Sequence, residues 1–168
     1  GEIVVTSDMP GAIFAGYYRN PKATAEALRT DGFHTGDAGS WTADGMLVFH
    51  GRMSDSVRCR GENVSAYEVE SVANRHPDVD ESAMIGVAAE IGEQDILLYV
   101  RPRTGAVPDP AALWEWMAPK LAPYQRPRFI DLIDEFPKTP SQRIQKHRLP
   151  KEPPHRWKAP ELRKGGDA

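Results

Sequence analysis

The tripeptide Thr35–Asp37 places a carboxylate directly after a glycine. A carboxylate can accept hydrogen bonds from two neighbouring hydroxyl groups, such as those of a nucleotide's ribose. Arg52, further along the chain, carries a guanidinium whose fork of donors suits ribose or phosphate oxygens. Glycine and aspartate are also common turn residues, so the tripeptide alone predicts a turn. The alternative for Arg52 is an ordinary surface side chain.

Two other segments combine arginine with residues that free or fix the backbone. Arg60 is followed by Gly61, and glycine permits a close approach to the backbone. Tyr124, Arg126 and Arg128 share a segment with two prolines, which favour a fixed, extended chain. Because arginine binds phosphate through paired hydrogen bonds, both segments are candidates for a phosphate-bearing ligand. The alternatives are a solvated basic edge at residue 60 and a core tyrosine flanked by solvated arginines.

Positive charges gather in a last polar segment, Phe136–Lys146, which contains Lys138 and Arg143. A fixed positive charge can stabilise the negative charge that builds up during a nucleophilic attack. This segment is therefore a candidate for a catalytic cation.

Four segments, in this order and spacing, resemble the adenylate-forming superfamily of acyl-CoA synthetases, peptide-synthetase adenylation domains and luciferases. Phe33–Asp37 resembles its aromatic-x-Thr-Gly-Asp motif, and Gly51–Ser65 resembles its Gly-Arg-x-x-Asp block running into Gly-Glu-Asn. Ala122–Arg128 resembles Pro-aromatic-Lys-x-Pro, and Phe136–Lys146 resembles Leu-Pro-(Lys/Arg)-Thr-x-(Ser/Thr)-Gly-Lys-(Ile/Val). The resemblance covers nearly all of Gly1–Leu149.

The resemblance implies roles for single residues. Asp37 would bind the ribose and Arg52 would reach the nucleotide. Ser54 falls on the hinge position, where the family usually has Asp or Lys. A hinge needs backbone freedom more than a particular charge, so we expect swinging to survive. The CoA-binding residues would be Arg60, Gly61, Tyr124, Arg126 and Arg128.

Arg143 falls where the family has its catalytic lysine, and Gln142 replaces the preceding glycine. The charge is kept, whereas its shape and hydrogen-bond geometry change, because arginine and lysine are not equivalent at a fixed site. Lys138 and Lys146 are out of register with that position. We therefore assign the catalytic role to Arg143.

The activity that this resemblance implies is that of an ATP-dependent acyl-CoA ligase. The enzyme would form an acyl-adenylate from a carboxylic acid and ATP, and then a CoA thioester with release of AMP. The Mg²⁺ site, the phosphate loop and the acid pocket would belong to a large N-terminal domain upstream of Gly1. The fragment alone would then be inactive. Two alternatives stay open: a catalytically impaired binding or regulatory homologue, and an adenylation domain that loads a carrier protein. The Arg-rich block Arg58–Ser65 resembles the carnitine/crotonobetaine-CoA ligase branch.

The expected fold is α+β, in two parts and a tail. Residues 1–52 contain short strands and turns, including a buried strand at 46–50, and would be a barrel-like β remnant of the large domain. Residues 53–150 follow the order β-α-β-β-α-β, which predicts a mobile small domain with a three-stranded sheet and packed helices. The proline-rich segment 151–168 would be a flexible tail.

Local signals set the expected element ends. In the first part, a helix is expected at 22–29. In the second, Ser65 and Glu68 form a capping-box pattern, and Asp109 precedes a helix that Pro119 should shorten. The remaining expected elements are strands at 57–59, 82–87, 95–100 and 129–133 and a short helix at 143–149.

Composition limits the other possibilities. The 168 residues carry a net charge of -3, which gives no indication of a nucleic-acid or anionic-membrane partner. No apolar stretch approaches the ~20 residues of a membrane span. The single cysteine, Cys59, excludes an internal disulfide and is expected to be a buried structural thiol in a cytoplasmic protein. The chain opens directly on a predicted strand, Gly1–Val5, without an initiator methionine, and we expect it to be part of a longer protein.

Overall fold

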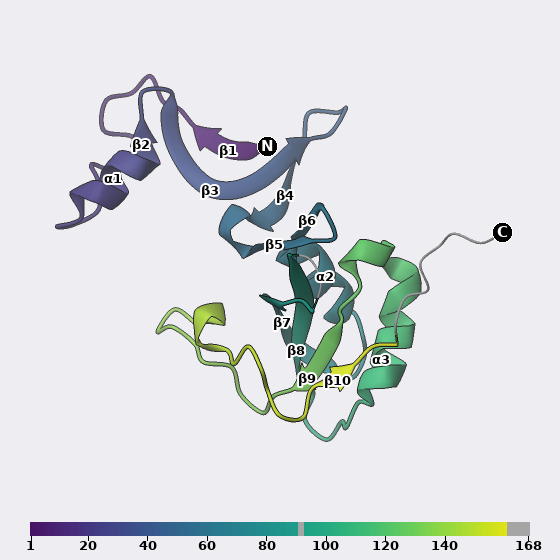
Figure 1. The fold of residues 1–168 in the computed structure, drawn as a ribbon. Coiled ribbons are helices and arrows are strands. Elements are labelled where there is room, and N and C mark those ends of the chain that lie inside the picture. Colours follow the sequence, from purple (N-terminus) through teal and green to yellow (C-terminus); the bar gives the residue numbers. More distant parts are fainter. Residues whose placement is uncertain (91–92, 161–168) are drawn as a thin grey trace. The chain divides into compact units, whose positions relative to one another are not determined.

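The structure is a computed structural model that describes residues 1–90 and 93–160. The chain forms two compact units, Gly1–Asp55 and a second that begins at Ser56 (Figure 1). This division lies close to the one expected after residue 52. No helix within the described ranges is long and apolar enough to cross a membrane.

The first unit is an antiparallel sheet built around one long curved strand, β3 (Gly32–Trp41) (Figure 1). Its partners are β1 (Glu2–Val5), β2 (Leu28–Arg29) and β4 (Leu47–Arg52). The helix expected at 22–29 is α1 (Pro21–Ala27), and the last two residues of that range form β2 instead. Within residues 1–55, all of which are described, the sheet is open and not a closed barrel.

The strand expected to be buried at 46–50 is β4, and this burial is not observed. The side chains of Leu47 and Val48 are 48% and 39% exposed. Within residues 1–55, all described, no large apolar side chain is fully buried. The apolar run is present, but burial also requires a second layer over the sheet, which these residues do not supply.

The second unit has a four-stranded sheet in the order β10-β9-β8-β7. The strands are β7 (Val79–Ala88), β8 (Gln94–Pro102), β9 (Phe129–Leu132) and β10 (Trp157–Lys158). Strands β8 and β9 are parallel, whereas the other two pairs are antiparallel. The three expected strands are confirmed, and β10 adds a fourth.

The helices α2 (Ala66–Ala73) and α3 (Pro110–Met117) cover one face of this sheet (Figure 1). Successive strand residues point to opposite faces, so β8 sends alternate residues to two separate cores. The core beneath the helices includes Met84, Ile96, Leu98, Val100 and Ile130 from the strands, with Val69, Leu113 and Met117 from the helices.

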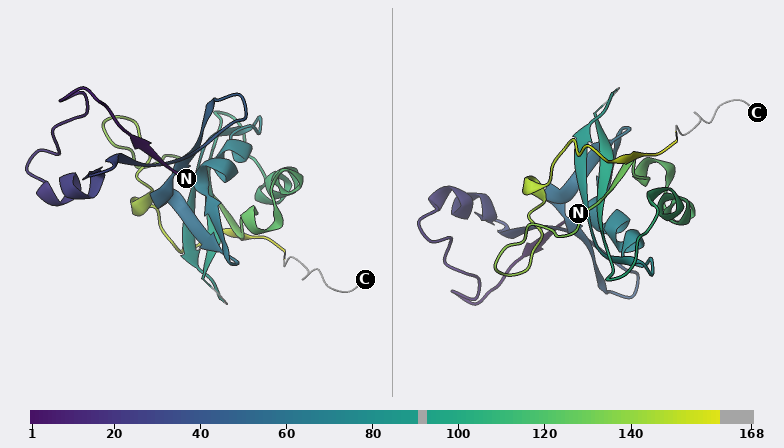
Figure 2. Two further views of the ribbon diagram at one scale, coloured as in Figure 1. Left: turned by 90° about the horizontal axis from the view of Figure 1, so that it is seen from above. Right: turned by 90° about the horizontal axis from the view of Figure 1, so that it is seen from below.

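Residues 133–149 cover the opposite face, where Phe136 and Leu149 pack against Leu97, Tyr99 and Phe129. The Tyr99 hydroxyl donates a hydrogen bond to the Pro150 carbonyl at 2.6 Å. Burial raises the pKa of Tyr99 to about 12, so the phenol stays protonated and keeps this bond. Figure 2 shows α3 and the covering segment on opposite sides of the sheet in two further views.

A tight hairpin joins β5 (Ser56–Cys59) to β6 (Glu62–Ser65). Its two turn residues, Arg60 and Gly61, have φ angles of 54° and 84°. Positive φ at both positions is the geometry of a type I′ turn, which matches the twist of the flanking strands. The inward side chains of the hairpin join the core beneath the helices, which fixes the turn to the rest of the unit.

The two expected helix caps have different outcomes. Asp109 accepts hydrogen bonds from the backbone of Ala111 and Ala112 at 3.3 and 3.2 Å, as predicted. Ser65 stands at the N-cap of α2, but its side chain makes no capping hydrogen bond. The capping box is wrong because Glu68 instead accepts a hydrogen bond from Gln125 at 2.6 Å.

Several elements are single 3-10 turns: η1 (Met53–Asp55), η2 (Ala118–Lys120), η3 (Pro123–Gln125) and η4 (Lys146–Arg148). Helix α3 ends at Met117, immediately before the turn that contains Pro119, as expected. The helix expected at 143–149 is reduced to η4. Part of the expected flexible tail is instead ordered: Trp157 pairs with Ile130 in the sheet. The rest of that tail, 161–168, lies outside the described residues.

We expect Leu98→Ala to lower the free energy of unfolding of the second unit by about 2–5 kcal/mol, because Leu98 is fully buried and truncation leaves a cavity. Val107→Ala is the matched control, since Val107 is 91% exposed and its loss should change stability by less than about 0.5 kcal/mol. Urea unfolding followed by tryptophan fluorescence measures both. Equal effects of the two substitutions would contradict the assigned core.

Candidate functional site

Asp37 and Arg52 are direct partners across the hairpin of β3 and β4. The Arg52 Nε lies 3.0 Å from the Asp37 Oδ1, and its Nη1 donates to the Thr35 carbonyl at 2.8 Å. Both side chains keep access to solvent, at 48% and 29% exposure. The sequence-predicted nucleotide residues therefore form one exposed polar site in the first unit, with the carboxylate oriented by the guanidinium.

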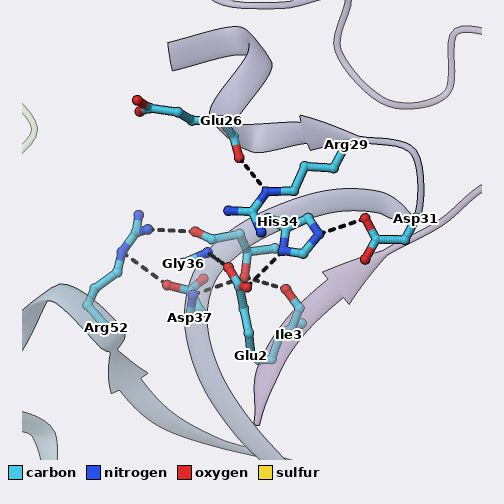
Figure 3. A network of polar contacts seen from close by, with 10 residues as sticks. Glu2, Ile3, Glu26, Arg29, Asp31, His34, Gly36, Asp37 and Arg52 are labelled. Atoms are coloured by element: carbon cyan, nitrogen blue, oxygen red, sulfur yellow. Dashed lines mark hydrogen bonds and ion pairs between the residues drawn. The ribbon is translucent and has the colours of Figure 1, made fainter. Parts of the chain in front are cut away.

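Two contacts from β1 hold the Thr-Gly-Asp loop (Figure 3). The Thr35 hydroxyl donates to the Ile3 carbonyl at 2.8 Å and accepts from the Asp37 amide at 3.0 Å. The Gly36 amide donates to the Glu2 carboxylate at 3.0 Å. Gly36 has a φ of 72°, a conformation that glycine adopts without strain. The loop is therefore a defined turn, and Glu2 is a site component that the sequence reasoning missed.

Ser54, the predicted hinge residue, lies in the turn η1, next to the boundary between the two units. Its side chain is exposed, and its hydroxyl donates to the Asp55 carboxylate at 3.3 Å. The position is compatible with a hinge, because few side-chain contacts are needed to hold an exposed single turn.

Arg143 lies in a tight loop whose backbone is held by Thr139. The Arg143 amide donates to the Thr139 hydroxyl at 3.1 Å, and the Thr139 amide donates to the Arg143 carbonyl at 2.9 Å. The Arg143 side chain is exposed. The loop therefore presents a guanidinium to solvent from a fixed backbone position.

Gln142 has a φ of 63°, in the left-handed region that favours glycine. A non-glycine residue costs roughly 1 kcal/mol there. The turn nevertheless forms, and the Gln142 amide donates to the Thr139 carbonyl at 2.9 Å. The replacement of glycine therefore keeps the loop geometry of the motif and changes only its energetic cost.

The two lysines that are out of register have carboxylate partners. Lys138 lies 2.8 Å from Glu81, and Lys146 lies 2.8 Å from Glu70. Glu70 also accepts a hydrogen bond from the Met84 amide at 2.6 Å. These ion pairs fasten both ends of the Arg143 loop to the sheet and to α2. Glu70 and Glu81 were not predicted, because their partners lie far away in the sequence.

The predicted CoA-binding arginines converge on one surface pocket. Its volume is about 180 Å³, and it is lined by Arg60, Trp114, Arg126, Pro127, Arg128, Ala159 and Pro160. Backbone carbonyls orient the guanidinium groups: Arg60 donates to Pro123 at 3.3 Å and Arg126 to Leu121 at 3.4 Å. Three arginines around one hollow give a strongly electropositive site for an anion.

Two structural features of this pocket could not be read from the sequence. The Trp114 indole donates to the Pro127 carbonyl at 2.9 Å, which ties α3 to the arginine segment. The Ala159 amide donates to the Arg128 carbonyl at 2.9 Å, so the segment expected as a tail forms part of the pocket.

Tyr124 and Gly61 lie near the pocket but do not line it. Tyr124 is half-buried and packs against the core beneath the helices, as the alternative interpretation predicted. Gly61 is exposed at the hairpin turn, with open space where a Cβ would stand. Arg58, the other basic residue of the hairpin, lies 3.4 Å from Glu93.

The pocket and Arg143 belong to opposite faces of the second unit's sheet. The hairpin that carries Arg60 packs into the core beneath the helices. Ile144, next to Arg143, packs into the core on the other face. One lobe thus carries two separate cationic sites, a single exposed arginine and a basic pocket.

No group of three or more potential metal ligands occurs among residues 1–90 and 93–160. These ranges therefore offer no site for the expected Mg²⁺, which we had assigned to a different domain.

Comparison with known families gives an independent assignment. Residues 68–143 match the family model of the AMP-binding enzyme C-terminal domain. The 2-succinylbenzoate–CoA ligase of Geobacillus kaustophilus is 40% identical over 149 residues, which cover 89% of this chain and 30% of that protein. MatB from Rhodopseudomonas palustris with bound ATP has a TM-score of 0.71 at 33% identity, over 80% of this chain and 27% of that one.

The segment 68–143 is thus an AMP-binding C-terminal domain of the adenylate-forming acyl-CoA ligase superfamily. The chain spans about 30% of the length of the curated relatives it matches. The crotonobetaine/carnitine–CoA ligase of Salmonella heidelberg is 30% identical over 150 residues, 89% of this chain and 29% of that protein. That branch is one of several with similar matches, so the comparisons do not single it out.

Cys59 is 3% exposed, and burial raises the pKa of its thiol. Because the thiolate is the reactive form, we expect iodoacetamide at pH 8 to label the folded protein at least ~10-fold more slowly than the urea-unfolded protein. The ordinary thiol pKa of ~8.5 in the unfolded chain makes the contrast measurable. Mass spectrometry of timed samples gives the two rates. Similar rates would contradict the structural role of this cysteine.

Proposed function

We propose that this chain is the C-terminal part of an ATP-dependent acyl-CoA ligase. In the complete enzyme, a carboxylate would attack the α-phosphate of ATP to give an acyl-adenylate and pyrophosphate. The CoA thiol would then attack the acyl carbon, form the thioester and displace AMP. The placement of Arg143 and the basic pocket on opposite faces of one sheet carries this proposal, because two separate sites suit two successive half-reactions.

Arg143 would act in the first half-reaction. Its exposed guanidinium stands on a loop fixed by Thr139 and by the ion pairs at both loop ends. A preorganised positive charge stabilises the charge that develops as a carboxylate attacks a phosphate. The two neighbouring lysines already have carboxylate partners, which supports Arg143 as the acting cation.

The basic pocket would act in the second half-reaction by binding a phosphate-bearing end of CoA. Its volume of about 180 Å³ is smaller than the ~300 Å³ at which pockets for whole drug-sized ligands begin. It therefore suits a phosphate group better than the complete cofactor. A carrier protein brings no nucleotide phosphates, so three converging arginines favour free CoA over a carrier.

The first unit would be the end of a large nucleotide-binding domain, with Asp37 and Arg52 facing the nucleotide and Ser54 as the hinge. Exposed apolar side chains support this proposal, because Trp41 and Met46 are 72% and 64% exposed. An apolar surface of this kind is typical of an interface with another part of a protein. The acid substrate, and the carnitine or crotonobetaine branch in particular, would be set by residues of that domain.

The test of the first role is Arg143→Ala in the full-length protein. We expect ATP–pyrophosphate exchange, with whichever acid of a panel supports it, to fall by about 10²–10³. Thioester formation from supplied acyl-adenylate should change by less than about threefold, because the charge is needed in the first step only. Equal loss in both half-reactions would contradict the assignment.

Arg143→Lys is the matched variant for this test, because it keeps the charge. An active wild-type protein excludes the impaired-homologue alternative. Activity in Arg143→Lys but none in the wild type would support that alternative instead.

The test of the pocket is the double variant Arg126→Glu/Arg128→Glu. We expect the KM for CoA to rise at least ~10-fold with the KM for ATP unchanged, because reversed charges repel the CoA phosphates. Arg103→Glu is the control, since Arg103 is exposed and does not line the pocket. An unchanged KM for CoA in a folded double variant would favour a carrier protein as the thiol donor.

A further inference from the structure

His34 lies between two carboxylates in the first unit (Figure 3). Its Nδ1 is 2.8 Å from Glu2 and its Nε2 is 2.9 Å from Asp31. The His34 side chain is only 10% exposed, whereas that of Asp31 is 67% exposed. Both ring nitrogens are therefore used, and the imidazole joins β1 to the turn before β3.

Glu2 connects this imidazole to the nucleotide loop. One carboxylate oxygen accepts from His34, and the other accepts from the Gly36 amide at 3.0 Å. Gly36 immediately precedes Asp37, the proposed ribose ligand. A displacement of Glu2 would leave the Gly36 amide without its acceptor and free the turn that aims Asp37.

The protonation state of His34 decides how many of these bonds can form. A neutral imidazole has one N–H and can donate to only one carboxylate, whereas the protonated ring donates to both. Charge-assisted hydrogen bonds are also the stronger kind. Protonation therefore completes the bridge from Asp31 through His34 to Glu2.

The charges around His34 favour its protonated form. Hydrogen bonds to Glu2 and then Asp31 raise the His34 pKa above its usual value, although the nearby Arg29 opposes this shift. The bond to His34 lowers the pKa of Glu2 and of Asp31, so both carboxylates are ionised partners. Arg29 is also held by the Glu26 carbonyl at 3.0 Å. On the other flank, Arg52 faces Asp37 and not the imidazole.

We propose that His34 and Glu2 are positioning residues for nucleotide binding, which hold the Gly36 amide and so aim Asp37 at the ribose only while His34 is protonated. This proposal rests on the proposed function of the first unit. His34 and Glu2 touch no reacting atom, so they should govern nucleotide affinity and leave the CoA step unchanged.

The direction of the pH dependence follows from the raised His34 pKa. The protonated bridge is complete below that pKa and is lost as pH rises through it. Nucleotide binding should therefore weaken with rising pH in that range, with the KM for ATP increasing and the rate of thioester formation from acyl-adenylate constant.

The experiment uses the full-length protein and measures AMP binding by isothermal titration, and the KM for ATP, between about pH 6 and about pH 9. We expect the wild-type affinity to fall about 3- to 10-fold across this range, the loss of one charge-assisted hydrogen bond. His34→Gln should bind AMP weakly at every pH. Glu2→Gln keeps an acceptor for the Gly36 amide but removes its charge, so its transition should move to lower pH.

His155→Gln is the matched control, because this exposed histidine of the second unit lies outside the network and should leave the wild-type profile unchanged. A wild-type pH profile in His34→Gln would overturn the proposal. So would an equal loss of the thioester step, which would indicate a general structural defect. Asp37→Ala separates the two hypotheses: if it leaves AMP affinity intact, the nucleotide site itself is wrong, whereas a selective loss there with a normal His34→Gln overturns the positioning role alone.

Discussion

The central strand β8 is buried on both faces, and this constraint organises the second unit. Its run Ile96–Val100 is apolar throughout, so alternate side chains must be covered from two sides. Helices α2 and α3 meet the requirement on one face, and residues 133–149 meet it on the other. The Arg143 loop and the arginine pocket are attached to these two different coverings. Their separation thus follows from the need to bury a two-sided sheet.

Both departures from glycine in the motifs keep the backbone conformation that glycine would adopt. Arg60 and Gln142 have φ angles of 54° and 63°. Each sits in a turn closed by neighbouring pairs, Cys59 with Glu62 in one case and Lys138 with Ile144 in the other. The surrounding hydrogen bonds outweigh the cost of roughly 1 kcal/mol for a side chain there. At residue 60, the same substitution adds a guanidinium to the basic pocket.

The first unit is held mainly by strand pairing and polar contacts. Asp37, Arg52, Glu2 and His34 come from three strands of one sheet, and no large apolar side chain of residues 1–55 is fully buried there. Such a unit has a well-defined hydrogen-bond network but little apolar stabilisation of its own. Its polar site and its exposed apolar surface are therefore two consequences of the same thin architecture.

The sequence by itself determined the α+β order, the start of α3 at Asp109, and the set of basic and acidic residues that the sites use. These features depend on local signals: alternating apolar residues, a cap, prolines and short motifs. Tertiary structure decided what depends on distant partners: Glu2 with His34, Glu70 with Lys146, and the packing of residues 157–159 beside Arg128. It also overruled the capping box at Ser65 and the burial of β4, because a side chain's partner and a sheet's second layer are supplied by residues far along the chain.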